Sequence, residues 1–322
     1  MECLRIVLRP LSAFGGPIRG DTLFGQICWA ALHRWGEARL EELLAGYTVG
    51  RPFAVCSDAF PVGHLPRPAL PLHRFDRLED EDRKAVKGRR WLPLEAVAEP
   101  VPHWLAACRS DAQVLAALGQ EGASRLAEGH AQARNSINRL SGTTGGAEFA
   151  PYAQPQLWFH QAARLDCWLL LDTERLAREE AHRLLRDIGL VGYGRDAGIG
   201  LGKFAIEGLA AQSLPCQPEA DACFTLAPCS PQGLGLDPGR SHYQIFTRFG
   251  RHGDRAVHTG LPFKAPALMA DTGAVLSGLE MPHGPFIGQG IGGDGSLSNA
   301  IPETVQQGYA PFIGVRLGES GA

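Results

Sequence analysis

The chain has 322 residues, of which 44% are hydrophobic and 20% are charged, and its formal net charge is −3. This composition is typical of a soluble globular protein long enough for two domains, and it excludes a surface that is basic throughout, so nucleic-acid binding would need a local patch. The eight cysteines form no Cys-x-x-Cys pair, which argues against a zinc ribbon or a disulfide framework. Without a signal peptide or an apolar run of ~18 residues, we expect a cytoplasmic protein.

The first sixty residues predict a strand, two helices and a second strand. Alternating Leu4, Ile6 and Leu8 predict a strand over 2–9. A helix is predicted over 22–35, with Asp21 as its N-cap. Its buried stripe is expected to consist of residues at helical spacing: Phe24, Ile27, Cys28, Ala31 and Trp35. A second helix, about 37–45, and a strand within 51–61 follow.

The next hundred residues are expected to form an excursion of about 50–155. Frequent prolines predict poor order from 61 to 100, and the basic residues of 83–90 favour a solvated loop. Helical pieces are expected within 104–118. Residues 129–159 carry polar side chains, a glycine-rich tip and then aromatic side chains, which predicts a protruding hairpin. An ordinary surface hairpin explains the same pattern.

The remaining elements indicate an α+β fold. A buried strand is predicted over 164–171, a helix over 173–188 closed by Gly189, and a strand over 203–209. Strand, helix, excursion, strand, helix and strand in this order fit a ferredoxin-like domain with a large insertion over 1–212. Beyond a proline-containing break at 214–218, a sheet-rich domain is expected over 213–322. Its strands are predicted at 223–227, 242–249, 273–279 and 312–317.

Residues 192–203, the glycine loop, form the most informative stretch. Such glycine density indicates unusual backbone torsions or a close approach to a ligand, and its cations favour an anion. A P-loop is excluded because Phe204 follows Lys203, and a dinucleotide fingerprint is excluded because the loop leads from a helix into a strand. The chemistry-bearing residues of the loop are Gly192, Tyr193, Gly194, Arg195, Gly198, Gly200, Gly202 and Lys203.

The sequence favours RNA binding over catalysis. It has neither a Gly-x-Ser-x-Gly elbow nor a His-Glu-x-x-His motif. His130, near Arg134 and Arg139, has the chemistry of a general acid or base, although a phosphate or base contact is favoured. Tyr193 and the aromatic residues near the hairpin offer stacking faces worth ~1–3 kcal/mol per base. Single-stranded RNA is therefore the expected ligand, with no cofactor or metal.

Four segments, in this order, resemble the Csm4 family, the Cas-five-like RAMP-superfamily subunits of type III-A (Csm) CRISPR effector complexes. A weaker similarity continues to 309–312. The four segments are 17–25 (with Asp21-Thr22-Leu23-Phe24-Gly25), 53–61 (with Ser57-Asp58-Ala59-Phe60-Pro61), 133–139 (Ala133-Arg134-Asn135-Ser136-Ile137-Asn138-Arg139) and 192–204.

The resemblance implies tandem ferredoxin-like (RRM-type) RAMP domains and a non-catalytic subunit of a type III-A interference complex. Such a subunit binds the repeat-derived 5′ handle of the crRNA and links the large polymerase-like, cyclase-bearing subunit to the backbone RAMP subunits. The implied RNA contacts are Arg19, the segment 134–139 with Asn138, and the glycine loop; Lys264 and His258 are further candidates. The residues leave two alternatives open, a RAMP-superfamily endoribonuclease that processes repeat RNA through a histidine, and a structural protein without RNA contact.

Overall fold

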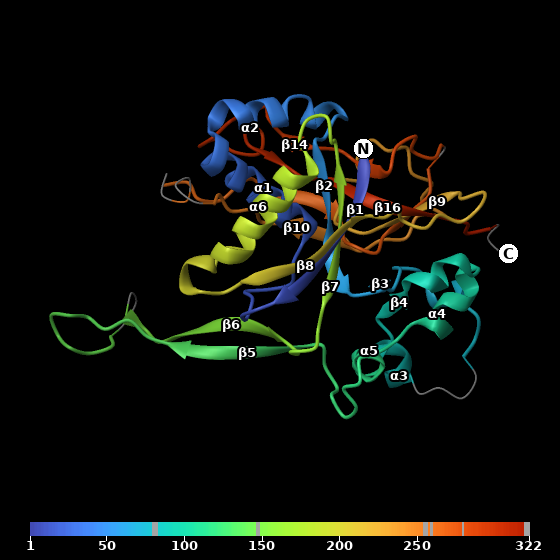
Figure 1. Cartoon of the computed structure of the whole chain (residues 1–322), viewed down its shortest axis with the longest axis horizontal. Coiled ribbons are helices and arrows are strands. Elements are labelled where there is room, and N and C mark those ends of the chain that lie inside the picture. The colour runs from blue at the N-terminus through green and yellow to red at the C-terminus, as the bar shows by residue number, and fades with distance from the viewer. Residues whose placement is uncertain (79–82, 146–148, 254–256, 258–259, 279, 319–322) are drawn as a thin grey trace.

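The computed structural model of the chain describes residues 1–78, 83–145, 149–253, 257, 260–278 and 280–318. Figure 1 shows a body of packed sheets and helices from which one long hairpin projects. None of the helices in the described residues has the length and apolar character that crossing a membrane requires.

The first sheet has four antiparallel strands in the order β2-β7-β1-β8. Leu4, Ile6 and Leu8 of β1 are at most 1% exposed, as their alternation predicted, and they pack beneath helices α1 and α6. Together these elements have the β-α-β-β-α-β succession of a ferredoxin-like unit. Their bounds are β1 Glu2–Pro10, α1 Gly20–Trp35, β2 Ala54–Pro61, β7 Leu165–Leu171, α6 Arg178–Val191 and β8 Phe204–Ala211.

Two predicted helix boundaries are wrong. Helix α1 begins at Gly20, so Asp21 lies inside the first turn and its carboxylate accepts from the N–H of Thr22 rather than capping the helix. Helix α6 continues past Gly189 to Val191. Gly189 is required for packing instead, because a Cβ there would lie 2.4 Å from the carbonyl oxygen of Phe204 on β8. Helix α2 (Glu37–Leu44) lies where it was expected.

The insertion between β2 and β7 begins with a folded lobe, which corrects the expectation of poor order from 61 to 100. Leu65, Leu92 and Trp104 are fully buried and pack with Trp168 of β7. Pro66 and Pro93 lie in strands, and the basic residues of 83–88 form a helix rather than a solvated loop. The lobe comprises β3 (His64–Pro66), α3 (Arg83–Gly88), β4 (Trp91–Pro93), α4 (Trp104–Ala107) and α5 (Asp111–Ala117).

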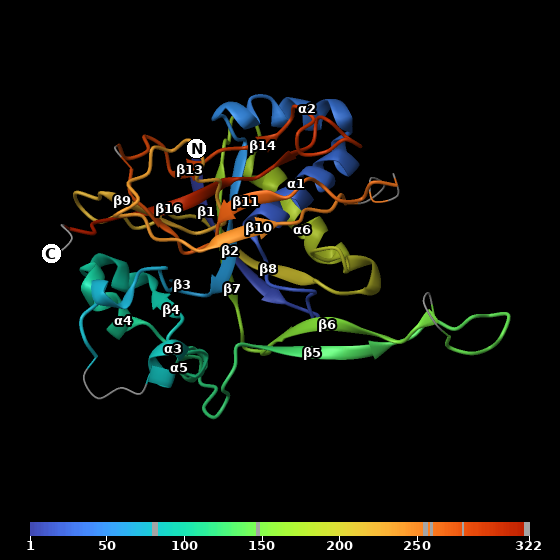
Figure 2. The same ribbon diagram turned by 180° about the vertical axis from the view of Figure 1, so that it is seen from behind.

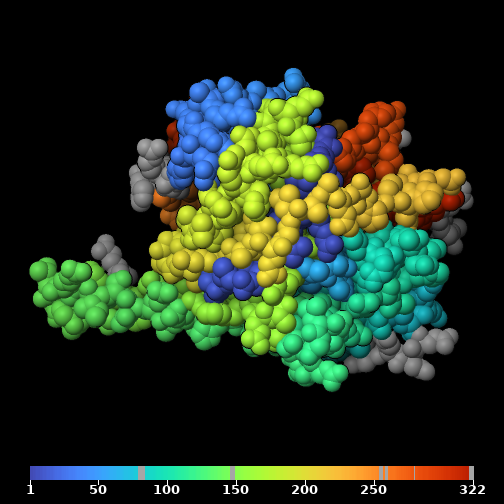
Figure 3. Space-filling model, viewed as in Figure 1, coloured from blue at the N-terminus to red at the C-terminus, as the bar shows by residue number. Residues whose placement is uncertain are grey.

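The predicted hairpin is confirmed. Strands β5 (Ala127–Arg134) and β6 (Tyr152–Phe159) pair antiparallel along their whole length. The space-filling view shows the hairpin extending away from the body, with its tip far from every other element (Figure 3). Its side chains are mostly exposed, so the hairpin presents a large surface to partners.

The C-terminal part is rich in sheet, as expected. Its main sheet is antiparallel in the order β12-β9-β16-β13, and the described residues after 211 contain no α-helix that would complete a second ferredoxin-like unit. Leu279, at the end of one predicted strand, lies outside the described residues. The strands are β9 Ala222–Thr225, β10 Ile245–Arg248, β11 Ala267–Ala270, β12 Val275–Leu276, β13 Phe286–Gly288, β14 Ile291–Gly292, β15 Val305–Gln306 and β16 Tyr309–Val315 (Figure 2).

Candidate functional site

The glycine loop connects α6 to β8, and two of its glycines hold it closed. A Cβ on Gly192 would lie 2.3 Å from the carbonyl oxygen of Leu201, and one on Gly202 would lie 2.1 Å from that of Tyr193. Both glycines also have positive φ, 123° and 80° respectively. Gly192 and Gly202 are therefore required by the loop's own fold rather than by a ligand.

The remaining glycines leave the backbone open to an approaching molecule. A Cβ on Gly194, Gly198 or Gly200 would meet no atom within 4 Å. In the described part of the chain, no acceptor binds the backbone N–H groups of Gly194, Arg195 and Gly198. Free N–H groups that converge in a glycine turn make an anion-binding concavity.

Two cationic side chains lie on the rim of this loop. The Arg195 side chain is 65% exposed, and within the described residues its one contact is a long one, 3.4 Å, with Asp196. Lys203 is exposed, and its ammonium has no carboxylate partner among the residues that the structure describes. Both charges are thus available to an anionic ligand.

Tyr193 does not offer the stacking face that the sequence suggested. Its side chain is only 5% exposed and packs beside Phe14, and its hydroxyl oxygen accepts the Arg19 N–H at 2.8 Å. Burial raises the pKa of this phenol far above its usual value. Tyr193 anchors the glycine loop to the segment before α1.

Residues 11–14, the linking segment, bring the glycine loop and the hairpin together. The Leu11 N–H donates to the Lys203 carbonyl oxygen at 2.8 Å, and the Gly202 N–H donates to that of Ala13 at 2.7 Å. Phe14 exchanges two backbone hydrogen bonds, 2.9 and 2.7 Å, with Leu157 of β6. Two segments that the sequence singled out separately are therefore joined by backbone hydrogen bonds through the linking segment.

One face of the hairpin is polar and aromatic. His130, Arg134 and Arg139 come from the first arm and the tip, and His130 and Arg139 are exposed. Asn138 shapes the tip, where its Oδ1 accepts the Leu140 N–H at 2.9 Å. Trp158 and Tyr152 present exposed rings, 51% and 53% accessible. The cross-strand pairs of this polar face are Glu128–Trp158, His130–Gln156, Gln132–Gln154 and Arg134–Tyr152.

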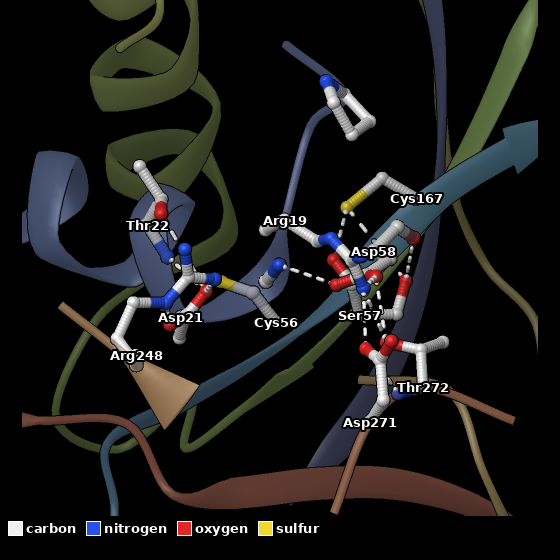
Figure 4. Close-up of polar contacts among 12 residues, drawn as sticks. Arg19, Asp21, Thr22, Cys56, Ser57, Asp58, Cys167, Arg248, Asp271 and Thr272 are labelled. Carbon is white, nitrogen blue, oxygen red and sulfur yellow. Dashed lines mark hydrogen bonds and ion pairs between the residues drawn. The ribbon is translucent and has the colours of Figure 1, made fainter. Parts of the chain in front are cut away.

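Arg19 is the centre of a buried ion cluster rather than a free cation. Its Nη1 contacts Asp58 Oδ2 at 2.9 Å and Asp271 Oδ1 at 2.8 Å (Figure 4), and its side chain is 27% exposed. The second Asp58 oxygen accepts the Gly20 N–H at 2.8 Å, so Asp58 caps α1 from the neighbouring strand. Beside this cluster, Asp21 forms a bidentate pair with Arg248, at 2.5 and 2.7 Å.

Burial raises the pKa of Asp58 to about 6, although the Arg19 guanidinium opposes that rise. Of the two carboxylates around Arg19, Asp58 belongs to the first sheet and Asp271 to the C-terminal part, so the cluster joins these two parts. The predicted RNA contact at Arg19 thus coincides with a structural anchor whose charge is already compensated.

The Lys264 backbone N–H donates to the Gly250 carbonyl oxygen at 2.9 Å. Burial lowers the pKa of its ammonium, while Cys28 and Asp21 of α1 act in the opposite direction. His258 lies outside the described residues. The described residues hold no group of three or more His, Cys, Asp or Glu side chains suited to a metal ion.

Sequence reasoning missed the amide side chains of the hairpin and both carboxylates of the Arg19 cluster. Polar residues alternate with alanine and glycine along the first arm and with Ala153, Pro155 and Leu157 along the second, and this period of two was the signal that could have placed Gln132 and Gln156 on one face. Asp58 was visible within its motif. The second carboxylate that contacts Arg19, Asp271, is 213 residues away from Asp58, and no local pattern points to it.

No family model matches the chain, and no curated protein matches it either. Its fold is nevertheless similar to solved structures. A chain of the crystal structure of a Csm1-Csm4 cassette in complex with pppApA aligns over 99% of this chain and 100% of its own length, with a TM-score of 0.60 and 16% identity. The cassette in complex with cA4 gives a TM-score of 0.60 and 17% identity over the same shares.

A third structure, a Csm3-Csm4 subcomplex of the type III-A CRISPR-Cas interference complex, aligns over 97% of this chain and 99% of its own, with a TM-score of 0.58 and 12% identity. Csm4 is the component that all three structures have in common. The structural neighbours therefore agree with the family that the sequence resembles. At these identities the likeness establishes the fold, and it does so along nearly the whole chain.

Proposed function

We propose that this chain is a Csm4-type, non-catalytic subunit of a type III-A CRISPR effector complex. It holds the repeat-derived 5′ handle of the crRNA and links the large polymerase-like subunit to the backbone RAMP subunits. Its N-terminal half is one ferredoxin-like domain of a tandem pair, and its C-terminal half is a divergent second domain, which in the described residues has strands but no α-helix. The observation that carries the proposal is the likeness, over 97–99% of the chain, to structures that share Csm4.

The geometry of the glycine loop supports the RNA-binding part of this proposal. The free N–H groups of Gly194, Arg195 and Gly198 suit phosphate oxygens, and the side chains of Arg195 and Lys203 supply countercharge. In this proposal, a strand of RNA runs from the glycine loop past the linking segment to the polar face of the hairpin. Such an arrangement binds through the backbone at the loop and through bases at the hairpin.

Two substitutions in the loop test this assignment. Arg195→Ala removes one phosphate contact, so it is expected to weaken all RNAs and to reduce the salt slope of binding by about one unit. Gly198→Val places a side chain in open space, at a residue without positive φ, and is expected to abolish the preference for handle-bearing RNA. Gly200→Val is expected to do the same, but Gly200 has a φ of 90°, so its effect includes backbone strain.

The measurement is fluorescence anisotropy with handle-bearing and scrambled RNAs, and Lys87→Ala on the separate insertion lobe is the matched control. Unchanged handle preference in Gly198→Val would rule out the glycine loop as the site. Cleavage of repeat RNA by the purified chain, lost in His130→Ala, would replace the non-catalytic assignment with the endoribonuclease alternative. Binding to the large subunit without any affinity for RNA would favour the purely structural alternative.

A further inference from the structure

Strands β10 and β11 form an arm whose outer face is apolar and exposed. This C-terminal arm, residues 245–253 and 260–270, lies on the side of the body that faces the viewer in Figure 2. From 245 to 252 exposed residues alternate with half-buried or buried ones, as in a strand with one solvent face. Such a face is usually polar. Here its large side chains are apolar, and their exposed fractions are 70% for Ile245, 72% for Phe249, 68% for Phe263 and 52% for Leu268.

Strand pairing places these side chains on the same side of the arm. Leu268 lies opposite Thr247, and Phe263 lies opposite Arg251. Opposite residues of an antiparallel pair point to the same side, so the two strands contribute to one continuous face. The described residues of the arm contain no Asp or Glu. Exposed aromatic and aliphatic side chains with an arginine and without acidic groups are typical of the core of a protein–protein interface.

The inner face of the arm is fixed to the body. The guanidinium carbons of Arg248 and Arg19 lie 4.7 and 5.7 Å from the centroid of the Phe246 ring. Arg248 also forms its ion pair with Asp21 of α1, and Met269, opposite Phe246, is only 1% exposed. The outer face is therefore ordered before a partner binds, which lowers the entropy cost of docking.

The outer edge of β10 also carries unpaired backbone groups. The Gln244 carbonyl oxygen accepts the Asp271 N–H at 2.9 Å, which sets the alternation of the antiparallel ladder. In this alternation Ile245 and Thr247 direct their N–H and C=O groups away from β11. Within the part of the chain that the structure describes, β10 pairs with β11 alone, and nothing else bonds to the backbone of these two residues. An unpaired edge beside an apolar face is a template for a further strand.

The charge of the arm favours a different protein as the occupant. Arg251 is exposed, its guanidinium carbon lies 6.0 Å from the centroid of the Phe263 ring, and no carboxylate among the described residues pairs with it. A second copy of the arm would bring no carboxylate to Arg251. RNA would need several cations along its path, and Arg251 is the one exposed cation of the arm in its described residues.

We propose that the C-terminal arm is the docking surface for one protein partner in the effector complex. The partner adds an extended strand to the free edge of β10, and the apolar layer that carries this strand covers Ile245, Phe249 and Phe263. A carboxylate of the partner meets Arg251. The inference rests on the proposed function, which requires protein partners, and adds the surface that one of them binds.

The test measures binding of the purified full chain to the large polymerase-like subunit and to the backbone subunit, each separately, by biolayer interferometry. Ile245→Lys places a charge on the apolar face. Thr247→Pro removes an N–H group that points away from β11, so the pairing within the arm is kept. Both variants, and Arg251→Glu, are expected to weaken binding to the same one of the two subunits about tenfold or more. Leu72→Lys is the matched control, because it makes the same change at an apolar residue, 65% exposed, on the insertion lobe. It is expected to stay within about twofold of the wild type.

A second measurement uses the wild type alone, so it does not depend on the folding of any variant. The backbone amides of Ile245 and Thr247 are expected to exchange with solvent at least about tenfold more slowly once the partner is bound. If these amides stay unprotected in the complex, or if Ile245→Lys and Thr247→Pro bind both subunits as the wild type does, the arm is not the docking surface and the proposed function stands. A dimer of the isolated chain that Thr247→Pro makes monomeric would assign the edge to a second copy instead. If the wild type binds neither subunit, both this inference and the proposed function fail.

Discussion

At the scale of single residues, the buried carboxylate of Asp58 has two structural roles. One carboxylate oxygen accepts the first N–H group of α1, and the other contacts Arg19 and the Thr272 hydroxyl, at 2.9 and 2.6 Å. A buried carboxylate is tolerated only when it is paired and hydrogen-bonded in this way. Asp58 thereby fixes the start of α1 and the position of Arg19 at the same time.

The raised pKa of Asp58 predicts a specific pH dependence. The group ionises near 3.8 in the unfolded chain and at about 6 in the folded one. Between these values the folded state binds more protons, so the contribution of Asp58 to stability is fully present below about pH 4 and is lost as the pH rises through about 6. Relative to Asp58→Asn, the wild type should therefore gain free energy of unfolding as the pH falls from about 7 to about 4.

Urea unfolding of both proteins across this range measures that difference. Asn cannot ionise, so the variant lacks the slope, and acid effects shared by all other groups cancel in the comparison. A constant difference between wild type and variant across the range would show that Asp58 titrates normally.

At the scale of elements, one arginine secures the end of a helix. The Arg175 guanidinium donates to the carbonyl oxygens of Glu42, Leu43 and Ala45 at the end of α2, at 2.9, 2.5 and 2.9 Å, and to that of Arg51 at 2.9 Å. The last carbonyls of a helix have no partner within it, so an external donor stabilises the turn that follows. Only the branched guanidinium reaches all four acceptors.

Arg175→Ala is accordingly expected to lower the free energy of unfolding by ~1.5–3 kcal/mol, the value of hydrogen bonds to a charged group. Arg175→Lys should recover only part of this loss. Arg178→Ala is the control, because Arg178 forms a surface ion pair with Glu2, which is worth at most about 1 kcal/mol. Chemical denaturation of the three variants measures their free energies of unfolding. Equal losses in Arg175→Ala and Arg178→Ala would contradict this account of α2.

The sequence predicted elements well where a single period governed them. The alternation of Leu4, Ile6 and Leu8 and the mostly apolar run of β7 were sufficient for the first sheet, because burial on one or both faces leaves a direct mark on sequence. Gly189 shows where prediction from sequence fails. A glycine needed for contact with Phe204 looks the same in sequence as one that ends a helix.

The candidate site was predictable only in part, for the same physical reason. Gly192 and Gly200 belong to one dense motif, yet the first closes the loop and the second leaves it open, and only the fold separates these roles. The stacking role assigned to Tyr193 was wrong because the loop folds its ring beneath the segment before α1. In the sequence, Trp158 is one of several aromatic residues near the hairpin, and its partners Gln156 and Gln132 emerge only from the fold.

At the scale of the whole molecule, the parts share their cores. Trp168 of the first sheet, Trp104 of the insertion and Phe224 of the C-terminal sheet lie in one buried cluster. The Arg19 cluster joins the same halves through charge. The glycine loop and the hairpin are thus mounted on a single packed body, which fixes their positions relative to one another.

The most direct test of the central claim is to isolate the chain together with the products of its neighbouring genes and to sequence the RNA that is retained. Holding a repeat-derived handle predicts short RNAs with one common 5′ end, and their recovery should fall in a complex that carries Gly198→Val. A complex with no RNA, or with RNA whose 5′ ends are scattered, would contradict the assignment and leave the chain with the fold but not the function of a guide-RNA-binding subunit.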